Sequence, residues 1–149
     1  MTNSVTPTVT DYDRVGGAPT IRAVVDRFYD LVLADGELAG YFTGLDLARI
    51  KRHQVLLLSQ VLGGPVTYDG RDLADAHRHL RVSGAHYDRV GQYLTGLLWK
   101  LDVDTDIIFR VADTLAAVRD QIVTPDPVPA PRAERRLLGG LLRRFAGAR

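Results

Sequence analysis

The sequence has no cysteine among its 149 residues. This absence excludes disulfide bonds, thiolate metal sites and cysteine nucleophiles. The sequence also lacks any uninterrupted apolar run near the roughly 20 residues that a membrane-spanning helix needs. The first seven residues contain neither a basic segment nor an apolar stretch of the kind that begins a secretory signal. We therefore expect a soluble, cytoplasmic protein.

Strand signals are missing as well, because no two alternating segments flank a hairpin turn. Helical periodicity is frequent instead, and a length of 149 residues favours one domain. The spacing predicts an apolar stripe on the first long helix at Ile21, Val24, Val25, Phe28, Tyr29 and Val32. Further helices are expected at about 47–62, 73–80, 83–101 and 105–123, with Asp46, Asp72, Ser83 and Asp104 or Thr105 as caps. The predicted fold class is all-α.

Composition divides the chain into four parts. Residues 1–10 are rich in Thr, Ser and Pro, and we expect them to be disordered. Residues 11–124 carry the helical periodicity and form the expected domain. Residues 125–132 are a proline-rich linker. Residues 133–149 form a basic amphipathic segment. From residue 132 onwards there are six arginines and one glutamate, a net charge of +5, which leaves −4 on the rest of the chain.

Two polar residues lie in otherwise apolar patterns. The helix at 47–62 has a predicted buried stripe of Ile50, Gln54, Leu57, Leu58 and Val61, with His53 at its border. A buried amide needs a partner, because an unpaired one costs about 1–3 kcal/mol. A neighbouring backbone group would satisfy Gln54, and so would a ligand.

The short helix at 73–80 places His77 on one face with Leu73, Ala76 and Leu80, whereas His79 points away. A histidine in such a place is either a hydrogen-bonded core residue or a metal ligand. The absence of cysteine and of a tight His/Asp/Glu cluster argues against a zinc site. A single axial histidine among apolar groups suits a flat, mostly apolar cofactor.

Several segments resemble the group I truncated haemoglobins over about residues 12–123. They are residues 12–17 (Tyr-Asp-Arg-Val-Gly-Gly), 24–35, 41–42 (Tyr-Phe), 54–55 (Gln-Val), 62–65 (Leu-Gly-Gly-Pro), 68–70 (Tyr-Asp-Gly), 76–77 (Ala-His) and 83–87. The resemblance implies a truncated globin, a two-over-two helical sandwich around haem b. Its glycine pairs allow shortened helices.

The resemblance also implies residue roles. His77 would be the proximal iron ligand, and Phe42 would pack against the haem ring. Tyr29 and Gln54 fall on distal ligand-binding positions, and Ile50 replaces the distal histidine of other globins. Further haem contacts would come from Tyr68, Leu73, Ala76, Leu80, Val82 and Tyr87.

Two histidine positions bear on this resemblance. His53 occupies a place where some cyanobacterial relatives have a second axial ligand. His53 would either bind the iron or lie at the pocket mouth, against solvent or a propionate. No histidine follows His86, so the covalent haem linkage of some relatives is not expected.

The resemblance implies a haem protein that reversibly binds oxygen, nitric oxide or carbon monoxide at ferrous iron. Bound oxygen would convert nitric oxide to nitrate, and an electron-donating reductase would restore the ferrous state. The alternative is an oxygen or nitric oxide carrier or sensor without turnover. The basic segment would be disordered or self-packed, or would dock on a membrane surface or an acidic partner. No nucleic-acid partner is expected.

Overall fold

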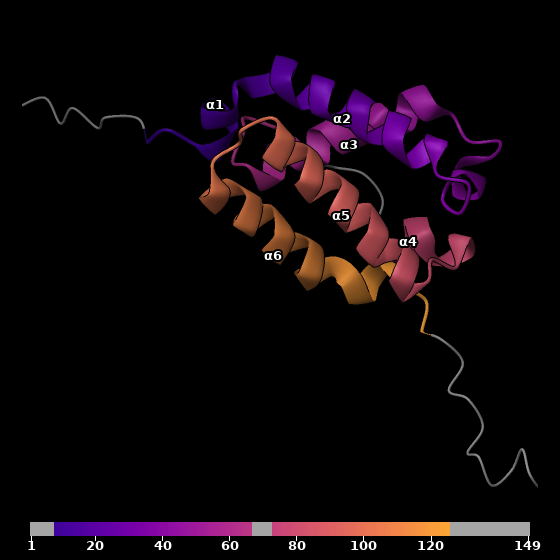
Figure 1. Cartoon of the computed structure of the whole chain (residues 1–149). Helices are drawn as coiled ribbons and strands as arrows, with labels where there is room; N and C mark the ends of the chain where they lie inside the picture. The colour runs from indigo at the N-terminus through magenta and orange to yellow at the C-terminus, as the bar shows by residue number, and fades with distance from the viewer. Residues whose placement is uncertain (1–7, 67–72, 126–149) are drawn as a thin grey trace, which may run out of the picture.

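The computed structural model describes residues 8–66 and 73–125, and this part of the chain is helical (Figure 1). The elements in order are α1 (Asp11–Val15), α2 (Gly17–Ala34), the 3-10 helix η1 (Ala39–Phe42), α3 (Leu47–Val61), α4 (Leu73–His77), the 3-10 helix η2 (Arg78–Leu80), α5 (Gly84–Lys100) and α6 (Thr105–Ile122). Within these residues the only β-type pairing is an isolated bridge between Val82 and Val123. The all-α prediction is confirmed.

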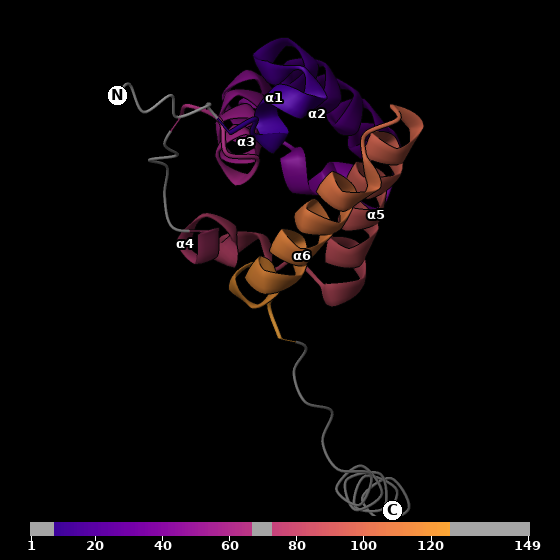
Figure 2. The same cartoon turned by 90° about the vertical axis from the view of Figure 1, so that its left-hand side faces the viewer.

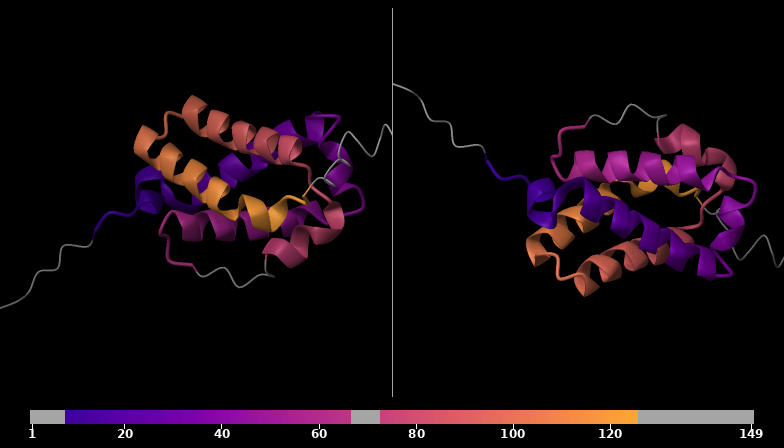
Figure 3. Two further views of the ribbon diagram at one scale, coloured as in Figure 1. Left: turned by 90° about the horizontal axis from the view of Figure 1, so that it is seen from below. Right: turned by 90° about the horizontal axis from the view of Figure 1, so that it is seen from above.

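The four long helices form two pairs. α2 packs against α3, and α5 packs against α6, while α2 also contacts α5. Figure 2 shows the α2–α3 pair on one side and the α5–α6 pair on the other, and Figure 3 shows α5 and α6 side by side from below. The most deeply buried large side chains lie between the pairs: Ile21, Val25, Val32, Leu38 and Ile107. This is the predicted two-over-two arrangement.

Local sequence signals explain where several helices begin. Asp46 accepts a hydrogen bond from the Arg49 amide at the start of α3, and Ser83 accepts one from the His86 amide at the start of α5. Both caps were predicted, because side-chain oxygens satisfy free first-turn N–H groups. Thr10, assigned from composition to the N-terminal segment, caps α1. The predicted cap Asp72 lies outside the described residues.

The buried stripe of α2 is the predicted one, but that of α3 is not. Leu58, Ser59 and Leu62 are buried at the core side of α3. Val61 is 36% exposed, and the rest of the predicted stripe, except Leu58, is only partly buried. The core therefore packs on a face of α3 rotated from the predicted stripe. The helix α3 has two apolar faces. The prediction from periodicity chose the face whose side chains the rest of the protein buries only in part.

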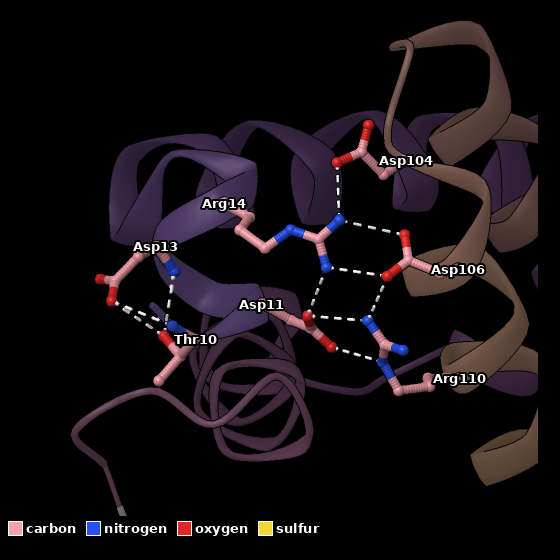
Figure 4. A network of polar contacts seen from close by, with 7 residues as sticks. All are labelled: Thr10, Asp11, Asp13, Arg14, Asp104, Asp106 and Arg110. Carbon is pink, nitrogen blue, oxygen red and sulfur yellow. Dashed lines mark hydrogen bonds and ion pairs between the residues drawn. The ribbon is translucent and has the colours of Figure 1, made fainter. Parts of the chain in front are cut away.

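A network of ion pairs joins α1 to the start of α6 (Figure 4). Arg14 lies 2.8 Å from both Asp104 and Asp106 and 3.0 Å from Asp11. Arg110 pairs with Asp11 at 2.6 Å and with Asp106 at 2.8 Å. The hydrogen bonds from Arg14 and Arg110 hold the pKa of Asp106 well below its usual range. The network holds α1 against α6, although the residues that form it are far apart in sequence.

The glycine pair after α3 allows α1 to pack closely against that helix. The Tyr12 amide donates to the Leu62 carbonyl at 2.8 Å, and the Gly64 amide donates to the Ser59 carbonyl at 2.8 Å. A Cβ at Gly64 would lie 2.6 Å from the Tyr12 ring and 3.0 Å from the Ser59 carbonyl oxygen. The position has no room for a side chain.

We predict that Gly64→Ala lowers the free energy of unfolding by about 1–3 kcal/mol, because the added methyl overpacks against Tyr12. Urea unfolding followed by circular dichroism measures the change. Gly36→Ala is the matched control, since a Cβ there meets nothing within 4 Å, and we expect a change below about 0.5 kcal/mol. Equal losses in the two variants would contradict the packing explanation.

Candidate functional site

Tyr29 lies on the buried face of α2 with only 4% of its surface exposed. Its ring forms T-shaped contacts with those of Phe28 and Phe42, with centroid distances of 5.1 and 5.6 Å. Burial raises the pKa of Tyr29 to about 12, so the hydroxyl stays protonated at neutral pH. Among the described residues this hydroxyl makes no hydrogen bond. It is a proton donor in an apolar setting, available to a ligand.

The half-covered face of α3 contains two of the predicted distal residues. Ile50 and Gln54 lie on it one turn apart, and both are partly buried. The Gln54 amide makes no hydrogen bond within the described part of the chain, so the backbone partner considered for it is not found there. His53, next to it on α3, is exposed.

His77 ends α4, and its ring orientation is set within that helix. Its Nδ1 lies 2.8 Å from the Leu73 carbonyl oxygen, one turn earlier. A carbonyl only accepts, so Nδ1 carries the proton, and the lone pair of the neutral ring is on Nε2. This is the form in which imidazole binds a metal. His79, two residues later, is exposed.

The surroundings of His77 are apolar and incompletely covered by protein. Leu73, Ala76 and Leu80 are all partly buried. α4 packs on α6, and Figure 2 shows no helix between α4 and α3. α3 and α4 thus each present a half-covered apolar face, and each face carries residues that the sequence assigned to the site.

The remaining predicted contacts have structural roles of their own. Tyr87 is buried, and its hydroxyl donates to the Leu115 carbonyl, which joins α5 to α6. The Val82 carbonyl accepts from the Thr124 amide at 2.9 Å and so holds the end of α6. Tyr68 lies outside the described residues. The structure directly brings together Tyr29 and Phe42, whereas the roles of the other residues toward haem remain predictions.

Asp35 is a positioning residue that the sequence analysis did not single out. Its carboxylate, with 4% of the side chain exposed, accepts from the Tyr93 hydroxyl at 2.7 Å and pairs with Arg89 at 2.6 Å. The Tyr93 bond, with the Glu37 amide and the Arg89 charge, lowers the pKa of Asp35. A carboxylate at the C-terminal end of a helix is destabilised by the negative end of the helix dipole. The place of Asp35 at the end of α2 was therefore the sequence signal that this residue needs stabilising partners.

A second unpredicted contact holds η1, which carries Phe42. The Tyr41 hydroxyl lies 2.6 Å from His86 Nδ1 at the start of α5, and the two rings meet edge to face. His86 Nε2 lies 3.5 Å from Glu37. Together with Asp35, this contact attaches the segment between α2 and α3 to α5 and sets the position of Phe42 beside Tyr29.

These features fit haem better than a polar metal centre. In the described part of the chain, no three His, Cys, Asp or Glu side chains gather into a group that could hold a metal ion. One oriented imidazole, two incompletely covered apolar faces and a tyrosine hydroxyl without a hydrogen bond among the described residues match a flat apolar group with one axial ligand. The described helices include none long and apolar enough to cross a membrane.

Comparison with known proteins gives the same family from sequence and from structure. The model for bacterial-like globins matches residues 10–124. A group 1 truncated hemoglobin from Mycolicibacterium paratuberculosis is 33% identical over 113 residues, covering 76% of this chain and 83% of the relative. A second, from Synechocystis sp., is 34% identical over 110 residues, covering 71% and 89%.

Solved structures agree. Truncated hemoglobin from Tetrahymena pyriformis, in its Fe(III) form, matches with a TM-score of 0.72 and 28% identity, covering 78% of this chain and 99% of that one. The 2/2 hemoglobin from Synechococcus sp., with covalently attached heme, matches with a TM-score of 0.69 and 29% identity, covering 75% and 94%. The chain therefore belongs to the bacterial-like globin family, and its fold is that of the truncated 2/2 hemoglobins.

Proposed function

We propose that this globin holds haem b through His77 and binds oxygen or another diatomic gas at the ferrous iron. Membership of the globin family supports haem-based binding of diatomic ligands. The observation that carries the proposal is the 2.8 Å bond from His77 Nδ1 to the Leu73 carbonyl, which leaves Nε2 as an oriented lone pair. His79, exposed on the same short segment, has no such bond to α4 among the described residues.

Haem held by His77 would supply an iron atom that binds a diatomic gas. The chain's residues then determine how strongly that gas is held. The Tyr29 hydroxyl would donate a hydrogen bond to charge that develops on the ligand, and a donor fixed in an apolar site acts strongly on such charge. Gln54 orients this hydroxyl or donates directly. Ile50 offers no hydrogen bond, and Phe42 packs against the cofactor ring.

The reaction we assign is the oxidation of nitric oxide to nitrate by bound oxygen, with electrons from a reductase. The support for it is the pair Tyr29 and Gln54, two donors that would retain oxygen until nitric oxide arrives. We place this activity in the cytoplasm. The alternative, a carrier or sensor that does not turn over, uses the same residues.

Replacing His77 with glycine should remove the axial ligand and weaken haem binding at least tenfold, because no other histidine of α4 or η2 faces the apolar side. Transfer of haem to an apo-myoglobin acceptor measures the loss. Added imidazole should restore the spectrum of the loaded protein. His79→Gly, which removes an exposed histidine from the same segment, is the matched control. Unchanged retention in His77→Gly would exclude His77 as the ligand.

Replacing Tyr29 with phenylalanine should accelerate oxygen dissociation tenfold or more, a loss of about 1.4 kcal/mol of stabilisation. The ring and its contacts with Phe28 and Phe42 stay, so only the donor is lost. Stopped-flow displacement of oxygen by carbon monoxide gives the rate. Tyr12→Phe, at the α1–α3 contact, is the control and should leave the rate unchanged. Equal rates for wild type and Tyr29→Phe would remove this residue from the role.

Turnover separates the enzyme from the carrier. With a reductase and excess oxygen, we expect many equivalents of nitrate per haem, measured as nitric oxide consumption at an electrode. Consumption that stops after one equivalent would favour the carrier or sensor.

The alternative in which His53 is a second axial ligand concerns the resting state of the same site. It requires a six-coordinate, low-spin spectrum in the reduced protein without oxygen. A five-coordinate, high-spin spectrum would exclude it and leave the distal side to Tyr29 and Gln54.

A further inference from the structure

Two large aromatic side chains are exposed at one end of the α5–α6 pair. Trp99, the only tryptophan in the chain, and Phe109 each have 65% of their surface exposed. Trp99 is in the last turn of α5, and Phe109 is in the second turn of α6. Single exposed apolar residues are ordinary, but neighbouring aromatics on one surface indicate a binding face.

A hollow lies between Trp99 and the first residue of α6. An open hollow of about 320 Å³ is lined by Trp99, Asp102, Val103, Asp104 and Thr105. Thr105 and Phe109 are four residues apart on α6, so their side chains lie on the same side of that helix. We call this surface the Trp99–Phe109 face. It lies at the end of the molecule where α6 begins next to α1 (Figure 1).

The border of this face is acidic. Asp102 and Asp104 line the hollow, and Asp113 follows Phe109 by one turn of α6. Asp104 is paired with Arg14, whereas Asp102 and Asp113 have no ion pair among the described residues. An apolar surface bordered by carboxylates fits an occupant that combines apolar side chains with cations. An anionic membrane would be repelled by the same carboxylates.

The chain contains such an occupant in its own sequence. Residues 133–149 have an apolar stripe at helical spacing, made by Leu137, Leu138, Leu141, Leu142 and Phe145. Four arginines, at 135, 136, 143 and 144, stand mainly off that stripe. The match to the globin family ends at residue 124, so this segment is additional to the globin domain.

The connecting segment is long enough to reach the face. α6 has 18 residues, so its ends are about 27 Å apart at 1.5 Å per residue. Ten residues, 123–132, separate the end of α6 at Ile122 from the start of the segment 133–149. A proline-rich segment of this length spans about 31 Å at 3.1 Å per residue. It therefore reaches from the end of α6 back to its beginning.

We propose that residues 133–149 dock on the Trp99–Phe109 face of the same molecule, with the leucine stripe on the two aromatics and the arginines against the aspartates at its border. The contact covers the only large aromatic surface exposed in the described part of the globin domain. It involves none of the residues assigned to haem, so it is independent of the proposed function.

Hydroxyl-radical footprinting read by mass spectrometry tests this on the haem-loaded full chain and on a chain ending at Pro131. We expect Trp99 and Phe109 to be oxidised at least threefold faster in the shortened chain. Leu31 and Leu45, which are 41% and 40% exposed elsewhere on the surface, serve as internal references and should not change.

A pair of matched variants separates apolar docking from charge alone. Leu138→Asp with Leu141→Asp should expose Trp99 and Phe109 as truncation does. Ala133→Asp with Ala146→Asp adds the same two charges outside the stripe and should keep the protection. Equal oxidation in the full and shortened chains would overturn the proposal. The proposal would also be overturned if the protein had the mass of a dimer and the protection of Trp99 and Phe109 were lost on dilution. Protection that arises only when anionic phosphatidylglycerol vesicles are present would overturn it as well.

Discussion

The buried carboxylate of Asp35 is the interaction on which the geometry of the site depends. It ends α2, accepts from Tyr93 and pairs with Arg89 on α5. Its backbone carbonyl accepts from the Leu38 and Ala39 amides, which starts the turn into η1. A buried charge is tolerated only when its partners are in place, so α2, η1 and α5 must come together in one arrangement. That arrangement brings Phe42 to the edge of Tyr29.

Local patterns predicted the parts of the fold that are local in origin. The α2 stripe and the caps at Asp46 and Ser83 depend on residues within a few positions of one another. The Asp35 contact could not be predicted in this way, because Tyr93 is 58 residues away. The ion pairs that join α1 to the start of α6 span 90 residues or more, so they could not be predicted from local patterns either. The bond from His77 to Leu73 spans four residues and was accessible to sequence reasoning.

The α3 helix shows what periodicity does and does not determine. Its predicted stripe is apolar and faces away from water in part, yet the protein core packs on the neighbouring face with Leu58 and Leu62. Periodicity identifies which residues avoid water, but not whether protein or a cofactor covers them. Gln54 on that stripe favours a ligand or cofactor as the cover, because its partly buried amide makes no hydrogen bond within the described residues.

A cofactor that covers these faces also contributes to folding. The partly covered apolar side chains of α3 and α4 would lose contact with water when a flat apolar group lies between them, and this burial stabilises the folded chain. A group that binds only the native state raises the free energy of unfolding in proportion to the logarithm of its concentration over its dissociation constant. Because α4 is short and packs mainly on α6, the bond from His77 to the cofactor would be a main constraint on its position. The residue that binds the iron and the residues that bury the ring would then be structural as well as functional, so substitutions at these positions need to be assessed for both roles.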